Sequence, residues 1–147
     1  MRTRNNLPDI PPLNEPPGSN FTTQTTLGNN VELKLRGGRY VLYAHLKNGS
    51  IRVRPGQRVR SGQMLARVGN SGQTGGSHLH FQVNDGPNLA ISDGLPFALR
   101  RFTLIGTVTN VPELLAGTAN ADVRRLQPPS PRRAQLPLHA TVVRLPG

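Results

Sequence analysis

Alternating apolar and polar residues predict a β-hairpin in the first half of the chain. Val31, Leu33 and Leu35 alternate with charged residues, Gly37-Gly38 follows, and a second patterned segment covers 39–46. A period of two is typical of strands with one buried face, and a glycine pair between two such segments favours a tight turn. We therefore expect two antiparallel strands joined at the glycines.

Two further short strands are predicted at 51–54 and 64–68. Between them lie the breaks Pro55-Gly56 and Ser61-Gly62, which favour a compact double turn. Residues 69–76 are rich in glycine and are expected to form a loop in which the backbone can closely approach a ligand.

The segment 77–83, which follows this loop, carries two histidines one residue apart. Side chains alternate between the faces of a strand, so His78 and His80 must project from one surface, together with Gln82. One strand can in this way offer a metal ligand beside an acid-base group. The apolar residues of the segment are expected to enter the core: Leu79, Phe81 and Val83.

The sequence divides into three predicted parts. These are a proline-rich extended arm at 1–26, a β domain at 27–110 and a proline- and arginine-rich tail at 111–147. Towards the C-terminus we expect a strand at 102–108, one helical turn within 111–119 and a terminal strand within 137–145. The prolines at 128–131 are expected to interrupt the stretch between the strand at 102–108 and the terminal strand.

Composition favours an all-β fold, with antiparallel strands around a modest core. Hydrophobic residues make up 35% of 147 residues, and 16 Gly and 14 Pro favour turns and short strands over long helices. Because the chain has no Cys, a metal would have to be held by histidine and carboxylate. No apolar run is long enough to span a bilayer, and none follows Met1 as a signal peptide requires.

The formal net charge of +11 is unevenly placed. Nine basic residues and no acidic one lie between Leu33 and Arg67, so an anionic partner is one interpretation. Since these arginines alternate with apolar residues, the simpler interpretation is the solvated outer face of a sheet. A nucleic-acid partner is not favoured, because no aromatic stacking platform lies among the arginines.

Several motifs together resemble one known family. Tyr43-Ala44-His45-Leu46, the glycine-rich stretch from Val68 to Gly72, and His78-Leu79-His80-Phe81-Gln82-Val83 are similar in order and spacing to the C-terminal half of a lysostaphin/LytM-type zinc metallopeptidase domain. The resemblance implies an antiparallel β-sheet or sandwich with a groove, hydrolysis of peptidoglycan peptides, and an extracellular or periplasmic location. Anionic wall polymers are the partner expected for the basic residues.

The resemblance also implies roles for three histidines. His80, the second of the pair, corresponds to a zinc ligand, whereas His78 and His45 correspond to groups beside the metal-bound water and the scissile carbonyl. Zinc lowers the pKa of its water and polarises the carbonyl, while imidazoles accept a proton or stabilise an oxyanion.

The family completes its zinc site with a His-x-x-x-Asp segment, which has no counterpart here. No histidine precedes His45, and the only acidic residues before it are Asp9, Glu15 and Glu32. We therefore expect weak zinc binding, and three interpretations stay open. The chain is a truncated peptidase, a degenerate module that binds the cell wall or a partner hydrolase, or a biotinyl/lipoyl-like domain. The last would require an exposed lysine between methionines, which neither Lys34 nor Lys47 provides.

Overall fold

The regular secondary structure of the computed structural model consists almost entirely of antiparallel strands, which confirms the all-β fold class. It describes residues 1–9, 22–88, 91–115 and 120–146. The chain forms two compact units, 1–95 and 96–147. No helix in the described part is long and apolar enough to cross a membrane.

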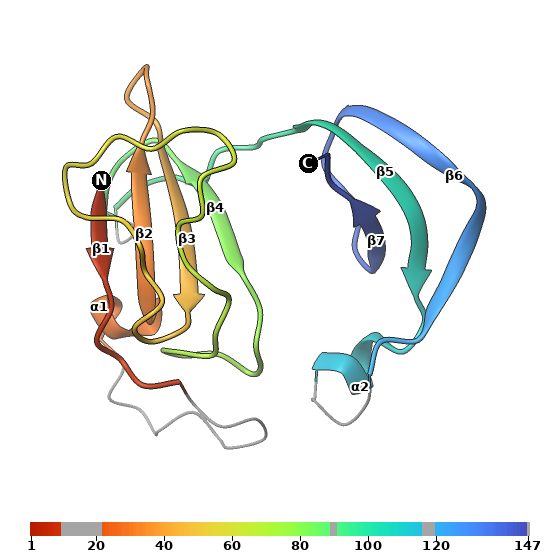
Figure 1. The fold of residues 1–147 in the computed structure, drawn as a ribbon, viewed down its shortest axis with the longest axis horizontal. Coiled ribbons are helices and arrows are strands. Elements are labelled where there is room, and N and C mark those ends of the chain that lie inside the picture. The colour runs from red at the N-terminus through yellow and green to blue at the C-terminus, as the bar shows by residue number, and fades with distance from the viewer. Residues whose placement is uncertain (10–21, 89–90, 116–119, 147) are drawn as a thin grey trace. The chain divides into compact units, whose positions relative to one another are not determined.

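The first unit contains one four-stranded sheet in the order β1-β2-β3-β4 (Figure 1). Its strands are β1 (Arg2–Arg4), β2 (Asn29–Lys34), β3 (Tyr40–Leu46) and β4 (His80–Asn84), and a short helix, α1 (Thr23–Thr26), precedes β2. The predicted hairpin is confirmed, because β2 pairs with β3 on either side of a turn in which Gly37 and Gly38 have φ values of 79° and 76°. The residue pattern did not predict β1, which adds an edge strand within the segment expected to be an extended arm.

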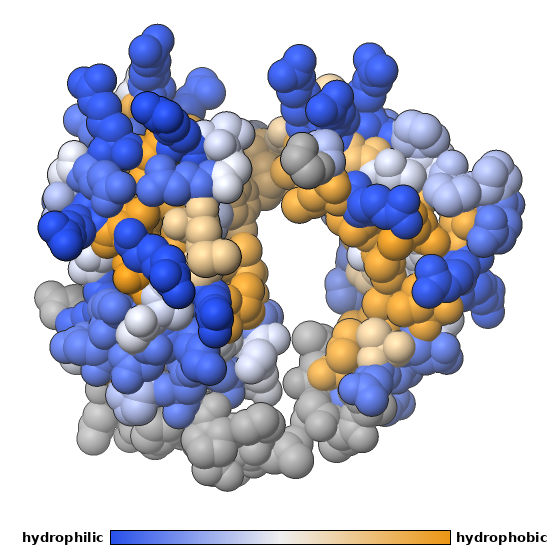
Figure 2. Space-filling view, in the orientation of Figure 1, coloured by the Kyte–Doolittle hydropathy of each residue, from blue (hydrophilic) through white to orange (hydrophobic). Residues whose placement is uncertain are grey.

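The core of the first unit is small and draws on an irregular segment as well as on the sheet. Val31, Leu46 and Val53 form its buried centre. Partly buried apolar residues pack around them: Met1, Leu33, Tyr43, Ile51, Val59, Leu65 and Ala66. The visible surface of the unit is mostly hydrophilic (Figure 2). Because the buried core is small, apolar burial alone gives the unit limited stability.

The strands predicted at 51–54 and 64–68 are wrong, although the double turn between them is present. The backbone N–H of Gln57 donates to Arg54 O at 3.1 Å, and the side-chain oxygen Gln57 Oε1 accepts from Arg54 N at 3.0 Å. Gln63 makes the same two bonds with Arg60, at 3.1 Å each. Local bonds of this kind satisfy backbone groups that a strand would pair with a neighbour, and they hold the segment as two successive turns.

The second unit contains a three-stranded sheet in the order β6-β5-β7. Its elements are β5 (Leu99–Val108), α2 (Val111–Leu115), β6 (Val123–Gln135) and β7 (Thr141–Arg144). The predicted strand at 102–108 and the helical turn at its described residues 111–115 are confirmed; residues 116–119 lie outside the described part. The units divide after Leu95 rather than near 110, because β5 pairs with β6 and β7.

β6 continues through the prolines at 128–131, but its pairing with β5 is interrupted close to them. Leu104 pairs with Ser130 and Gly106 pairs with Arg125, so residues 126–129 are left out of the ladder. β6 is an edge strand, with β5 on one side only. A proline lacks the N–H that a central strand needs, but an edge strand tolerates this loss where the missing donor would point away from its neighbour. Sequence pattern alone could not show that this strand lies at an edge.

Glu32 provides a pH-dependent test of this fold. The residue is only 8% exposed, and burial raises the pKa of its carboxyl above 4.5, although Arg2 on the paired strand acts in the opposite direction. The folded state therefore holds the proton more tightly than the unfolded state. The contribution of Glu32 to stability is therefore fully present below pH 4.5 and is lost as the pH rises through the higher, folded-state value.

We accordingly expect Glu32→Gln, which cannot ionise, to unfold at a higher urea concentration than the unchanged chain at pH 7. The difference should shrink as the pH is lowered to 4.5. Urea titrations followed by circular dichroism at both pH values measure it, and an equal difference at the two would contradict a buried ionised carboxylate as the cause.

Candidate functional site

The structure brings His45, His78 and His80 together. The ring centroid of His45 lies 4.8 Å from that of His78 and 5.7 Å from that of His80. His45 is 4% exposed, His80 is partly buried and His78 is exposed, so the cluster runs from the interior of the first unit to its surface.

Strand pairing explains this proximity. Ala44 on β3 is opposite His80 on β4, and the isolated bridge between Gly69 and His78 extends the pairing beyond the start of β4. The Gly69 amide donates to His45 O at 3.0 Å, which places the glycine-rich loop between the two histidine segments. Because β4 begins only at His80, strand alternation does not reach Leu79, which is 42% exposed and not in the core as predicted.

The backbone at His45 is strained. Asn29 pairs with Leu46 and Val31 pairs with Tyr43, so two residues of β3 face Asn30 alone. This is the geometry of a β-bulge, which redirects side chains, and within it His45 has a φ of 56°. A residue with a Cβ adopts this left-handed conformation at a cost of about 1–2 kcal/mol.

His45 is held in one tautomer by the backbone. Its Nδ1–H donates to the carbonyl oxygen of Ser71 at 2.9 Å, which leaves Nε2 without a proton in the neutral ring. Burial lowers the pKa of His45 below 6.5, and the nearby imidazoles of His78 and His80 lower it further, although the bond to Ser71 raises it. The ring is therefore neutral at pH 7 and can accept a proton at Nε2.

His78 is held in a similar way by the glycine-rich loop. Its Nδ1–H donates to Gly76 O at 2.8 Å, and the hydroxyl of Thr74 lies 3.2 Å from the same nitrogen. Thr74 is itself buried and fixed by bonds to Asn70 Oδ1 and Gly76 O. The loop thus orients the ring and leaves Nε2 open.

A chain of amide side chains along β4 orients His80. Its Nε2–H donates to Gln82 Oε1 at 3.0 Å, and Gln82 Nε2 donates to Asn84 Oδ1 at 2.6 Å. Asn84 is 1% exposed. This arrangement leaves Nδ1 as the nitrogen of His80 that is open to a ligand.

A family comparison supports the relationship indicated by the motifs. Residues 19–91 match the model of peptidase family M23. The chain therefore contains a partial M23 domain. We refer to residues 19–91 as the M23 region. It includes β2, β3, β4 and the histidines His45, His78 and His80, whereas β1 and the second unit lie outside it. No solved structure matches the chain.

Two buried polar residues in the M23 region support the histidines and were missed by the sequence analysis. Asn29 N donates to Ser71 Oγ at 2.9 Å, and Ser71 Oγ donates to Leu46 O at 2.7 Å. Asn29 also exchanges two bonds with the backbone of Leu7, at 2.8 and 2.7 Å. Since Asn29 and Ser71 lie 42 positions apart, residue spacing gave no signal of their contact.

The side chains of the described M23 region do not by themselves fit a zinc centre. A catalytic zinc takes three protein ligands and keeps a position open for water. No three His, Cys, Asp or Glu side chains among the described residues form a group able to hold a metal. The acidic residues that precede His45 do not complete the site. Asp9 forms an isolated backbone β-bridge with Ser71, but its carboxylate accepts from Asn48 N at 3.3 Å. Glu32 lies on β2, and Glu15 is outside the described residues.

Close backbone packing at Gly69 holds the His45 and His78 segments together. A Cβ at this position would lie 2.4 Å from the backbone N and Cα of Lys47, whereas a Cβ on Gly75 would meet nothing within 4 Å. We expect Gly69→Ala to lower the free energy of unfolding by about 2 kcal/mol. Gly75→Ala, the matched control in the same loop, should change it little. Urea denaturation compares the two, and equal effects would contradict this packing constraint.

The strain at His45 predicts an unusual order of stabilities. His45→Gly and His45→Ala both remove the bond to Ser71, but only glycine adopts the positive φ without a steric cost. The glycine variant should therefore be more stable than the alanine variant by about 1 kcal/mol. Urea midpoints of the two variants measure this, and a more stable alanine variant would refute the strained bulge.

Proposed function

We propose that the M23 region recognises peptidoglycan peptides at the His45, His78 and His80 cluster. The observation that carries this proposal is that each ring has one nitrogen fixed by the protein and one left open. Such an arrangement orients three polar groups toward an incoming ligand at little entropic cost. Family M23 membership supports a peptide as that ligand.

The three histidines differ in what they can do. His45 is buried and neutral, so its Nε2 can accept a proton from water or from a substrate group. His78 is exposed and presents its Nε2 at the surface, where the neutral ring can accept a hydrogen bond from a peptide N–H. His80 offers Nδ1, and we assign it as the metal ligand of the cluster, as the family resemblance implies.

Hydrolysis by this donor set alone is not expected. Only His80 has a ligand role, while the other two histidines are assigned to proton transfer, so the set falls short of three ligands. The ordered scaffold and the incomplete donor set together favour a second candidate function, a non-catalytic module that binds the cell wall. We infer an extracellular or periplasmic location from either function.

The basic residues of the double turn provide a further contact surface for an anionic wall polymer. Arg52, Arg54, Arg58 and Arg60 are all exposed there. Attraction of this kind weakens as salt is added, because the charges lie in solvent.

Zinc titration of the complete chain by calorimetry tests the assignment of His80. We expect a dissociation constant above about 1 μM, because one assigned ligand cannot supply the affinity of a three-ligand site. His80→Ala should weaken this binding further, whereas His139→Ala, which changes an exposed histidine outside the M23 region, should not. Stoichiometric binding well below 1 μM that His80→Ala abolishes would show a complete site and contradict the proposal.

Sedimentation with purified peptidoglycan separates the two candidate functions. Binding without release of soluble peptides supports the module, and release of peptides on adding zinc supports the peptidase. If the chain neither sediments with peptidoglycan nor cleaves it, recognition of peptidoglycan by this region is refuted.

A further inference from the structure

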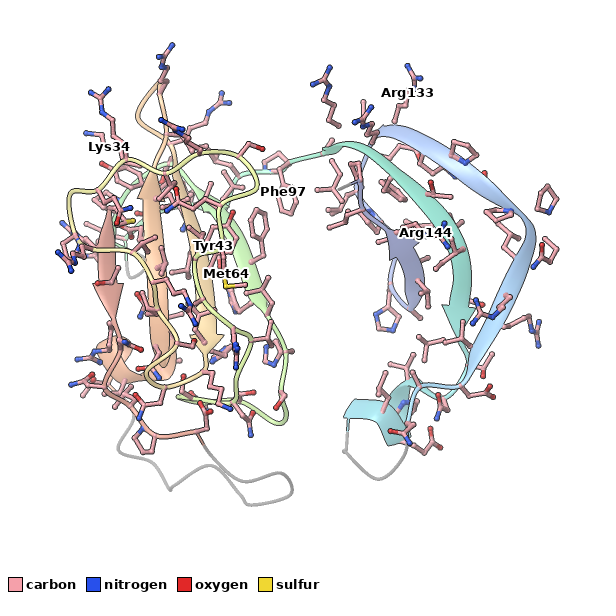
Figure 3. The ribbon with its side chains drawn as sticks, viewed as in Figure 1. Lys34, Tyr43, Met64, Phe97, Arg133 and Arg144 are labelled. Carbon is pink, nitrogen blue, oxygen red and sulfur yellow. The ribbon has the colours of Figure 1, made fainter. Side chains whose placement is uncertain are left out.

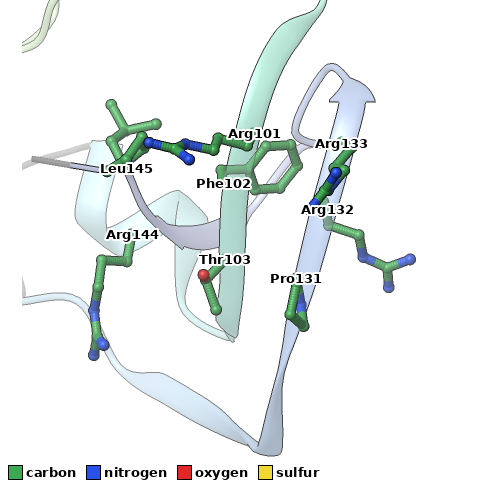
Figure 4. A pocket seen from close by; sticks show the side chains of 9 residues that line it. Arg101, Phe102, Thr103, Pro131, Arg132, Arg133, Arg144 and Leu145 are labelled. Atoms are coloured by element: carbon green, nitrogen blue, oxygen red, sulfur yellow. The ribbon is translucent and has the colours of Figure 1, made fainter.

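The second unit contains a pocket that is separate from the M23 region and has a volume of about 210 Å³. All three strands of the unit contribute to its lining (Figure 4). Four of the lining residues are arginines: Arg101 on β5, Arg132 and Arg133 on β6, and Arg144 on β7. Figure 3 shows Arg133 and Arg144 on their separate strands.

The charge of this pocket is not balanced by the described residues around it. No acidic side chain lines it, and none of the four arginines forms an ion pair within the described ranges. The acidic residues of the unit lie beyond the other end of β5. Glu113 is in α2, and Asp122 accepts a bond from the Thr109 hydroxyl at 2.8 Å.

Strand register places like charges next to each other. Arg101 is directly opposite Arg133, and Thr103, two residues further along β5, is opposite Arg144 on β7. Like charges directly opposite on neighbouring strands destabilise a sheet. Figure 4 shows the side chains of Arg101 and Arg132 extending to opposite sides of Phe102. A bound anion would offset this repulsion.

We propose that this pocket binds a phosphate group. A guanidinium presents a planar pair of N–H donors that matches two phosphate oxygens, and several arginines together can neutralise a doubly charged group. The exposed side chains of Arg101, Arg133 and Arg144 are long enough to turn inward when an anion removes their repulsion. The volume is below that of a typical drug-sized site, so it suits one phosphate with a short attached carbon chain.

Apolar residues complete the site. Leu145 and Pro146 follow Arg144 and line the pocket, whereas Phe102 is 6% exposed and offers little surface to a ligand. Leu145 and Pro146 offer contact to the carbon atoms of a phosphate ester but none to free phosphate. Inorganic phosphate and glycerol 3-phosphate share the recognised group and differ in this carbon portion alone.

Titration of the full chain with each of these two compounds, followed by amide chemical shifts in NMR at constant ionic strength, tests the proposal. We expect saturable shifts at Arg101–Thr103 and around Arg133 and Arg144, with acetate at the same concentration producing none. Tighter binding of glycerol 3-phosphate would identify an ester as the occupant, and tighter binding of inorganic phosphate would identify the free ion. Binding of neither compound in the millimolar range would overturn the proposal.

Arg100 provides a matched control. It is exposed and adjacent to Arg101 on β5, but it does not line the pocket. Arg101→Gln should weaken phosphate binding about tenfold, whereas Arg100→Gln, which removes the same charge, should weaken it by less than about twofold. Equal losses in the two variants would show general electrostatic attraction and would refute a defined site.

Thermal unfolding gives an independent measurement. If the arginines repel one another, Arg101→Gln should melt above the unchanged chain without phosphate and should gain less when phosphate is added. Circular dichroism checks that the unchanged chain and Arg101→Gln are both folded before melting. A phosphate-induced rise in melting temperature that is the same in the unchanged chain and in Arg101→Gln would count against the site.

Discussion

The first unit depends on one group of hydrogen bonds between two fully buried polar residues, Asn29 and Ser71. The Ser71 hydroxyl accepts from Asn29 N and donates to Leu46 O, and the Ser71 carbonyl oxygen accepts from the His45 ring. The side-chain oxygen of Asn29 accepts from Leu7 N. A buried polar group without a partner costs about 1–3 kcal/mol. Every buried side-chain nitrogen and oxygen in the described part has a partner, so this group joins β2, β3 and the glycine-rich loop with no unsatisfied atom.

This constraint explains how a strained histidine persists at the site. The positive φ of His45 costs free energy, but its amide donates to Leu27 O, its carbonyl accepts from Gly69 and its ring donates to Ser71. Three bonds to two different segments, one at Leu27 and one at 69–71, determine one conformation, so the strain cannot relax without breaking them. The bulge consequently directs an imidazole, and not a backbone group, toward His78 and His80.

The sequence predicted local features better than contacts between distant segments. Alternation identified the β2–β3 hairpin, and Pro55-Gly56 and Ser61-Gly62 identified the double turn, because both features depend on neighbouring residues. The strands predicted at 51–54 and 64–68 are absent, and the side chains of Gln57 and Gln63 bind the backbone of the turns between these two segments. At the site, the spacing of His78 and His80 indicated a pair, but the inclusion of His45 came from family resemblance, and neither source indicated Ser71.

The organisation of the histidine cluster also separates folding from metal binding. In a site that a metal assembles, the ligands are ordered only when the ion is bound, and binding free energy becomes folding free energy. Here Ser71, Gly76 and Gln82 orient the three rings through protein contacts alone. The cluster is therefore pre-organised, and its affinity for a metal depends on the number of ligands it supplies and not on the cost of arranging them. It follows that His45, His78 and His80 hold their geometry whether or not the zinc set is complete.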